Sequence, residues 1–385
     1  MKNIADRVAG IAESKSIKLA AVVSELRSQG KKIIGLNVGE PDFDTPAPII
    51  DATRTALKEG RTRYSLVEGI QELRTAIAGR HNNLHPRKIT AKNVLISNGS
   101  KQILYNIFQT LINPGEEVII PIPYWVTFPE SVKLAGGIPV YVNTTKSQLD
   151  LAAIEAAITP KTKVIIINSP NNPSGAVYPE SDLRELAQMA KKHDLYVISD
   201  EAYEAVLFDN LKPIHMGSFE EDTFERTISV QSFSKSYCMT GFRLGYMLAS
   251  EKIISAVNKL QGHLTGNNCT FAQYGALEAL NMNQSIIDDM VQLMQKRRDL
   301  AFSLFSQIFP KMEKPQGAFY LWPDVRDMIE GKFSDDIAFA EFILREAGVA
   351  ILPGSAFGAP GYLRICFAPS EIEIREGFEK IKSIL

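Results

Sequence analysis

The chain has 385 residues, 45% of them hydrophobic and 22% charged, a composition typical of a globular protein with roughly two or three domains. Its 42 basic and 44 acidic residues give a formal net charge of −2, so the composition predicts neither a nucleic acid nor an anionic membrane as partner. The three cysteines and five histidines show neither a disulfide framework nor metal-site spacing, so we expect no bound metal. There is no signal-peptide pattern and no membrane-length apolar run, and we expect a cytoplasmic protein.

The N-terminal part of the chain, up to about Thr45, predicts one helix over residues 18–30 and then a loop over 38–46. Short apolar runs then alternate with helical patterns. The predicted strands are residues 93–97, 116–122, 138–143, 163–168, 195–199, 227–233 and 244–249. Several are apolar on consecutive residues, as expected for strands covered on both faces. The sequence therefore predicts an α/β fold with a mainly parallel, seven-stranded sheet and helices on both faces.

The C-terminal part differs from the middle of the chain. Beyond Asn283 the pattern predicts a long helix over 285–308 and short strands within 317–325 and 363–370. We interpret residues 46–289 as a large domain. We interpret residues 1–45 and 290–385 together as a smaller α+β domain made from both chain ends.

Polar and small residues follow several of the predicted strands. In open α/β sheets, ligands bind outside the carboxyl ends of the strands. The segments at those ends are Asn98–Lys101, Pro123–Trp125, Ser169–Gly175, Asp200–Tyr203 and Ser232–Ser236, with Arg243 beyond. Each of them alone is equally well explained by a helix cap, a turn or packing. Their joint occurrence at one edge predicts a ligand site.

The combination suits pyridoxal phosphate, which needs a lysine for a Schiff base, an acid facing its pyridine nitrogen, and a phosphate cup. Lys235 can supply the amine and Asp200 the acid. Tyr203 and Asn172 can donate to the phenolate oxygen of the ring, and Trp125 can stack on its face. The residues that can hold the phosphate are Gly99, Ser100, Ser232, Ser234 and Arg243.

Four motifs together resemble one enzyme family: "VGEPDF", "NSPNNPSG", "DEAY" and "SFSKSYCMTGFRLGY". They are similar to those of the class I, fold type I pyridoxal-phosphate aminotransferases. The likeness extends from Gly39 to Arg364 and is greatest to the bacterial aspartate aminotransferase subgroup, which includes prephenate and aromatic relatives. The resemblance implies a homodimer with its sites at the interface.

The resemblance also implies individual roles. Arg364 matches the arginine that grips the substrate α-carboxylate, Tyr64 a tyrosine that reaches the neighbouring subunit's phosphate, and Lys101 a contact for a distal carboxylate. The implied catalytic residues are Lys235, Asp200 and Tyr203. The implied cofactor contacts are Tyr64, Gly99, Ser100, Lys101, Trp125, Asn172, Asp200, Tyr203, Ser232, Ser234, Lys235 and Arg243. The implied substrate contacts are Gly39, Lys101, Trp125, Asn172 and Arg364.

The predicted activity is ping-pong transfer of an amino group between an L-amino acid, aspartate first, and a 2-oxo acid, 2-oxoglutarate first. Prephenate or aromatic substrates, and a pyridoxal-phosphate lyase or synthase reaction, stay open as alternatives. A dehydrogenase is disfavoured because no G-x-G-x-x-G follows a strand, and a regulatory protein because no DNA-binding segment is attached. The segment Glu13–Ala20 departs from the "PSxT" pattern of the family at Glu13 and Lys15, which leaves the second substrate open.

Overall fold

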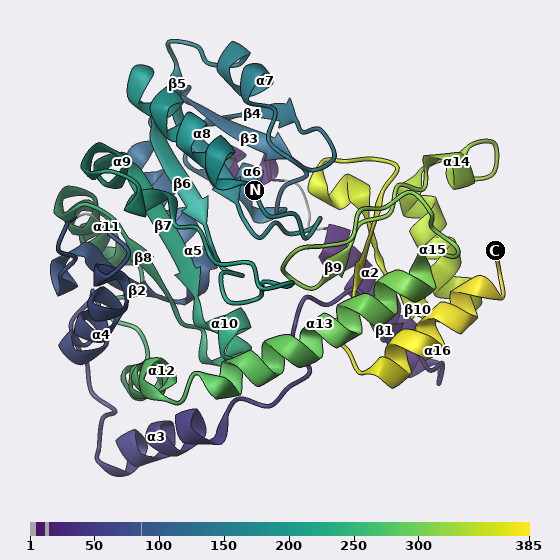
Figure 1. Ribbon diagram of the computed structural model, residues 1–385, viewed down its shortest axis with the longest axis horizontal. Helices are drawn as coiled ribbons and strands as arrows, with labels where there is room; N and C mark the ends of the chain where they lie inside the picture. Colours follow the sequence, from purple (N-terminus) through teal and green to yellow (C-terminus); the bar gives the residue numbers. More distant parts are fainter. Residues whose placement is uncertain (1–4, 12–14, 86) are drawn as a thin grey trace.

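The computed structural model describes residues 5–11, 15–85 and 87–385, and its central element is a seven-stranded sheet (Figure 1). The strands are β2 (Val94–Ser97), β3 (Glu117–Ile122), β4 (Ile138–Asn143), β5 (Thr162–Asn168), β6 (Tyr196–Asp200), β7 (Thr227–Ser232) and β8 (Gly245–Leu248). Their order is β2-β8-β7-β6-β5-β3-β4, and only β8 runs antiparallel to its neighbours. The predicted mainly parallel sheet is confirmed, with each strand at its predicted place.

Helices cover both faces of the sheet, which is why its strands are apolar on consecutive residues. In β5, Val164 and Ile166 belong to the core on one face, and Ile165 and Ile167 to the core on the other. The helices of the first face are α5 (Gly99–Leu111), α6 (Thr127–Leu134) and α11 (Glu251–Leu264). Those of the second face include α3 (Ala47–Lys58), α4 (Gln71–Asn82), α7 (Leu151–Ala156), α8 (Glu180–Lys192), α9 (Glu221–Arg226) and α12 (Thr270–Asn281).

Elements from both chain ends gather beside this sheet (Figure 1). β1 (Ile34–Gly35) pairs in parallel with β10 (Val349–Ala350), and Ile34 and Leu36 share a core with residues 294–381. A three-stranded antiparallel sheet has the order β11 (Leu352–Pro353), β12 (Leu363–Cys366) and β9 (Tyr320–Leu321). The helices of this group are α2 (Lys15–Ser28), α13 (Ser285–Phe305), α14 (Arg326–Ile329), α15 (Asp336–Ala347) and α16 (Glu371–Lys382). The domain boundary that we propose at residue 289 falls inside α13, which runs from one group to the other.

The turn after β6 is held by both groups of elements. Tyr203, Val206 and Phe208 belong to the same buried core as the chain ends. Arg298 of α13, with a fully buried side chain, donates to both carboxylate oxygens of Asp209 at 2.6 and 2.8 Å. This turn, which carries two of the predicted catalytic residues, is therefore fixed from two sides.

The N-terminal segment is described only in part. Helix α1 (Asp6–Ala9) precedes the atypical segment Glu13–Ala20, and α2 begins within this segment at Lys15. Glu13 and Ser14 lie outside the described residues. Within the described ranges, no helix combines the length and the apolar character that crossing a membrane requires.

Candidate active site

Lys235 lies in α10 (Phe233–Ser236), a short helix that begins immediately after β7. The Ser232 side chain accepts a hydrogen bond from the backbone N–H of Ser234 at 3.1 Å. This cap ends the strand one residue earlier than predicted, because it turns Phe233 into the helix. Lys235 Nζ donates to the backbone oxygen of Gly39 at 2.6 Å.

The surroundings of Lys235 disfavour its charged form. Burial lowers the pKa of the amine to about 8; Glu40 opposes this change, while Arg364 and Arg243 add to it. At pH 7, roughly a tenth of such an amine carries no proton. Lys235 can therefore act as a nucleophile or a base near neutral pH.

Asp200, the last residue of β6, is buried at the carboxyl edge of the sheet. Burial raises the pKa of its carboxyl group to about 7, the backbone N–H of Ala202 at 3.2 Å opposes that rise, and Glu201 adds to it. Asn168 donates from its side chain to the backbone oxygen of Asp200 at 2.9 Å. A buried acid of this kind gains most from a cationic N–H partner, such as a protonated pyridine.

Tyr203 meets a residue that the sequence prediction omitted, Tyr320. Their hydroxyl oxygens lie 2.7 Å apart in the buried interior. The guanidinium carbon of Arg364 lies 4.3 Å from the centre of the Tyr320 ring. A Cβ atom on Gly39 would lie 2.0 Å from the Tyr320 hydroxyl oxygen, so only glycine fits there. Tyr320 thus touches a predicted catalytic residue and two predicted substrate contacts.

Arg364 is held in place but keeps one donor free. It donates to Asn172 Oδ1 at 3.0 Å and to the backbone oxygen of Asn37 at 2.6 Å. Its Nε is buried and has no hydrogen-bond partner within the part of the chain that the structure describes. A buried donor without a partner costs stability unless a ligand satisfies it, and a carboxylate is the natural acceptor.

The start of α5 forms a cradle for an anion. A Cβ atom on Gly245 would lie 2.7 Å from the backbone nitrogen of Ser100, and one on Gly99 would lie 3.0 Å from Arg243 Nη2. Strand pairing places Gly245 opposite both Ser97 and Ser232. The structure therefore brings the predicted phosphate contacts together, with backbone N–H groups and the helix dipole available to a negative ligand.

Lys101 and Trp125 lie together at the side of this cradle. Lys101 Nζ is 5.2 Å from the centre of the Trp125 ring. Trp125 is half-buried and meets Phe128 edge-on, with ring centres 5.7 Å apart. The aromatic face and the ammonium group are thus both near the predicted phosphate site.

Tyr64 stands apart from these contacts, with 98% of its surface exposed.

A cavity of about 710 Å³ is lined by parts of residues 40–45, 238–243 and 269–272. Arg243 is the predicted site residue that lines it. The cavity is therefore beside the anion cradle, and not at Lys235.

Comparison with known proteins identifies this arrangement. Residues 31–381 match the family described as aminotransferase class I and II. The chain belongs to this family. The aspartate aminotransferase of a Bacillus species (strain YM-2) is 39% identical, covering 98% of each chain. The aspartate/prephenate aminotransferase of Cereibacter sphaeroides is also 39% identical, covering 100% of this chain and 98% of the relative.

A solved structure gives the same result for the fold. Thermus thermophilus aspartate aminotransferase with maleate superposes with a TM-score of 0.93, at 37% identity and over 100% of both chains. The chain is therefore an enzyme, a transaminase, and members of its family use pyridoxal phosphate. The roles of the individual site residues stay predictions.

Tyr320 offers a prediction that separates its hydroxyl from its ring. Tyr320→Phe leaves the buried Tyr203 hydroxyl without its partner and should lower the free energy of unfolding by about 1–3 kcal/mol. Tyr320→Leu also removes the aromatic face beneath Arg364, so it should in addition raise KM for the amino acid. Equal KM values for the Leu variant and the wild type would contradict this assignment of the ring.

The buried charge of Lys235 should lower the free energy of unfolding of the apoprotein in a defined pH range. The folded pKa of about 8 lies below the ordinary 10.5, so the cost is full below pH 8 and disappears between pH 8 and 10.5. Lys235→Met should therefore raise the free energy of unfolding at pH 7 by roughly 1–3 kcal/mol. Denaturant titration across this range measures the gain, with exposed Lys161→Met as control. A gain that is independent of pH would show that its cause is not the charge.

Proposed function

We propose that this aminotransferase binds pyridoxal phosphate at the carboxyl edge of the sheet. The observation that carries the proposal is the Lys235 amine, held by Gly39 and deprived of much of its charge by burial. The cradle at Gly99 and Gly245 suits the phosphate, and the buried Asp200 carboxyl group suits the pyridine nitrogen. When bound, the cofactor supplies an electron sink that acidifies the α-carbon of the amino acid.

The residues of the chain then divide the remaining work. Lys235 Nζ removes the α-proton of the amino acid, for which a pKa of about 8 is well suited near neutral pH. Asp200, as a carboxylate, keeps the ring nitrogen protonated. Tyr203 and the amide nitrogen of Asn172 donate to the phenolate oxygen of the ring. The Oδ1 of Asn172 is already engaged by Arg364, which leaves its NH2 end to donate.

The substrate that we propose first is aspartate, with 2-oxoglutarate as amino-group acceptor. The unpaired Nε of Arg364 suits an α-carboxylate, and the Lys101 ammonium suits a second carboxylate. The relatives described above are named aspartate aminotransferases, and the Thermus thermophilus structure holds maleate, a four-carbon dicarboxylate.

Prephenate is a second candidate, because one relative is named an aspartate/prephenate aminotransferase. Prephenate is a 2-oxo acid with a further carboxylate on its ring, so the same pair of cations, Arg364 and Lys101, could bind it. The exposed position of Lys101 leaves space for a ring beside Trp125.

A homodimer would cover aromatic and apolar side chains that are exposed in the single chain. Tyr64 is 98% exposed, and three apolar residues of the same part of the chain, Val38, Ile50 and Leu66, are also exposed. Exposed apolar side chains of this kind are typical of an interaction surface. We infer that a second copy packs here and that Tyr64 reaches its phosphate site. The cytoplasmic location stays a prediction.

The first test concerns the cofactor and the reaction type. Holoenzyme should show a visible absorption band that borohydride erases, and Lys235→Ala should abolish turnover while it still binds the cofactor noncovalently. Aspartate alone should yield one equivalent of oxo acid per site and then stop. Continued product formation without a 2-oxo acid would instead indicate a lyase.

The second test concerns specificity. Lys101→Ala should raise KM for aspartate about tenfold or more, because it removes a charge-assisted hydrogen bond, and should leave KM for alanine nearly unchanged. Lys161→Ala, at the other edge of the sheet, is the control. If prephenate is also a substrate, its KM as amino-group acceptor should rise in the Lys101→Ala variant, as the KM for aspartate does. Unchanged aspartate kinetics in the Lys101 variant would remove the argument for a dicarboxylic substrate.

A further inference from the structure

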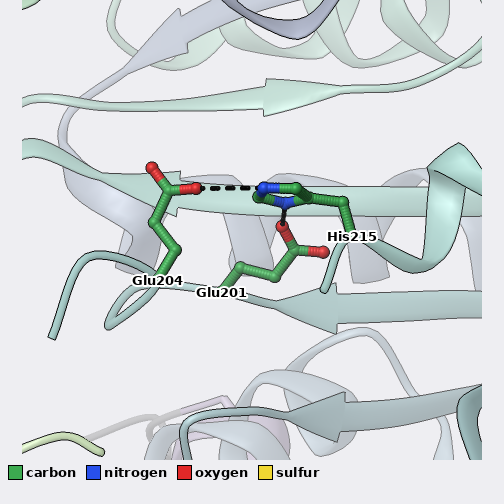
Figure 2. Close-up of side chains that lie close together, drawn as sticks. All are labelled: Glu201, Glu204 and His215. Atoms are coloured by element: carbon green, nitrogen blue, oxygen red, sulfur yellow. Dashed lines mark hydrogen bonds and ion pairs between the residues drawn. The ribbon is translucent and has the colours of Figure 1, made fainter. Parts of the chain in front are cut away.

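Three buried charged or titratable side chains that follow Asp200 in the chain, Glu201, Glu204 and His215, lie close together (Figure 2). Successive strand residues point to opposite faces, so Ser199 and Glu201 share the face that Asp200 does not use. Ser199 Oγ donates to Glu201 Oε1 at 2.8 Å. His215 Nδ1 lies 2.6 Å from Glu201 Oε2, and its Nε2 lies 3.6 Å from Glu204 Oε2.

Arg80 of α4 extends this network to the segment that carries Lys235. Arg80 donates to Glu204 Oε1 at 3.2 Å and to the Tyr237 hydroxyl at 2.5 Å. Tyr237 lies two positions after Lys235. The network therefore connects the turn of Asp200 and Tyr203 with the lysine segment, without using any of the atoms assigned to the reaction.

His215 supplies a positive charge in this network. Burial opposes that charge, but the carboxylates of Glu201 and Glu204 outweigh burial and raise the pKa of His215 to about 9, against a smaller opposing effect of Arg80. At neutral pH, two cations, His215 and Arg80, thus face two carboxylates, Glu201 and Glu204.

Two further histidines that face His215 stay neutral. The ring centre of His81 lies 5.4 Å from that of His215, and burial followed by the charges of His215 and Arg80 lowers the pKa of His81 to about 2. Burial also lowers the pKa of His85, with His215 as the next cause. The charge balance of the network therefore depends on His215 and Arg80.

The balance matters for Asp200, because Glu201 is its neighbour along the chain and both side chains are buried. Burial is the main cause that raises the pKa of Asp200, and the Glu201 carboxylate adds to that rise. With His215 charged, Glu201 is compensated. Without His215, Glu201 would keep only two neutral donors, Ser199 Oγ at 2.8 Å and Gln231 Nε2 at 2.6 Å. Its negative charge would then have no cation in contact, and the ionised form of the neighbouring Asp200 would become less stable.

We propose that the network of Arg80, Glu204, His215 and Glu201 balances the buried charge next to Asp200, so that the Asp200 carboxylate stays ionised for the ring nitrogen of the cofactor. The proposal rests on the proposed function, because Asp200 has this task only when a pyridine ring is bound. None of the four residues needs to touch that ring.

The experiment measures the Asp200 pKa directly, in apoprotein labelled with ¹³C at aspartate carboxyl groups, with Asp200→Asn to assign the signal. His215→Gln should raise the Asp200 pKa, and Glu201→Gln should lower it, because the two changes alter the local charge in opposite directions. A merely structural role would not produce opposite signs. Because this measurement needs no cofactor, it stays informative even if the proposed function fails.

Charge-balanced variants extend the test to holoenzyme. His215→Gln should weaken cofactor binding about tenfold and lower kcat with little change in KM for the amino acid. The double variant with His215→Gln and Glu201→Gln should recover cofactor affinity, since it removes one charge of each sign. His193→Gln, a half-buried histidine just before the start of β6, should match the wild type and serves as control.

Three results would overturn the proposal. The first is an Asp200 pKa that is the same in all variants. The second is equal loss of cofactor affinity in the single and double variants. The third is a bound metal, since single atoms of Glu201, Glu204 and His215 lie within 4.8 Å of one another. A bound metal would be shown by one equivalent of metal in dialysed protein, or by a change in the ¹³C signal of Asp200 when EDTA is added. Should His215→Gln not fold, His215→Asn replaces it in both measurements, with the same expected signs.

Discussion

The interaction on which the rest of the site depends is the hydrogen bond from Lys235 Nζ to the backbone oxygen of Gly39, at 2.6 Å. A primary amine at the edge of a sheet, partly covered by protein, loses much of the hydration that stabilises its charge, and its pKa falls to about 8. A neutral acceptor such as a backbone carbonyl holds this amine in place and adds no full negative charge that would favour its protonated form. The two residues are 196 positions apart, so the elements of the chain ends have to close over the sheet for this contact to exist.

Because the elements of the chain ends lie over the sheet, one short segment, Asn37–Glu40, contacts several residues of the site. The backbone oxygens of Asn37 and Gly39 accept from Arg364 and Lys235, respectively. Gly39 also packs against the Tyr320 hydroxyl group so closely that no side chain fits. A substitution at Gly39 would therefore displace the lysine and the tyrosine together. This coupling makes the placement of the Lys235 amine and of the Arg364 guanidinium group a single structural property.

The sheet, and the gathering of most of the predicted site residues at one of its edges, could be predicted from the sequence because both depend on local patterns. Consecutive apolar residues reveal strands covered on both faces, and the polar residues at their ends lie at one edge by necessity. The antiparallel direction of β8 could not be predicted, because the apolar run of a buried strand reads the same in either direction. Tyr320 and Arg80 were missed for another reason: their roles arise from contacts with Tyr203 and Glu204, far away along the chain. Lys101 and Tyr64 stay open because their proposed partners, a substrate and a second subunit, lie outside the chain.

The distribution of charge at the site follows from the same constraint. Arg243, Arg364 and Lys101 are each proposed to bind one anionic group of cofactor or substrate: the phosphate, the α-carboxylate and the distal carboxylate, respectively. Burial is the main cause that lowers the pKa of Lys235, and the charges of Arg364 and Arg243 lower it further. Asp200 has the opposite problem, because burial disfavours its ionised form, and no cation of this set contacts it among the described hydrogen bonds and ion pairs. A site with cations for several anionic groups on one side therefore needs the buried Asp200 carboxylate to be stabilised from the other side. Glu201, which forms a buried pair with His215, lies next to Asp200 in the chain, and the proposed role of the charge on His215 is to offset the effect of Glu201 on the ionisation of Asp200.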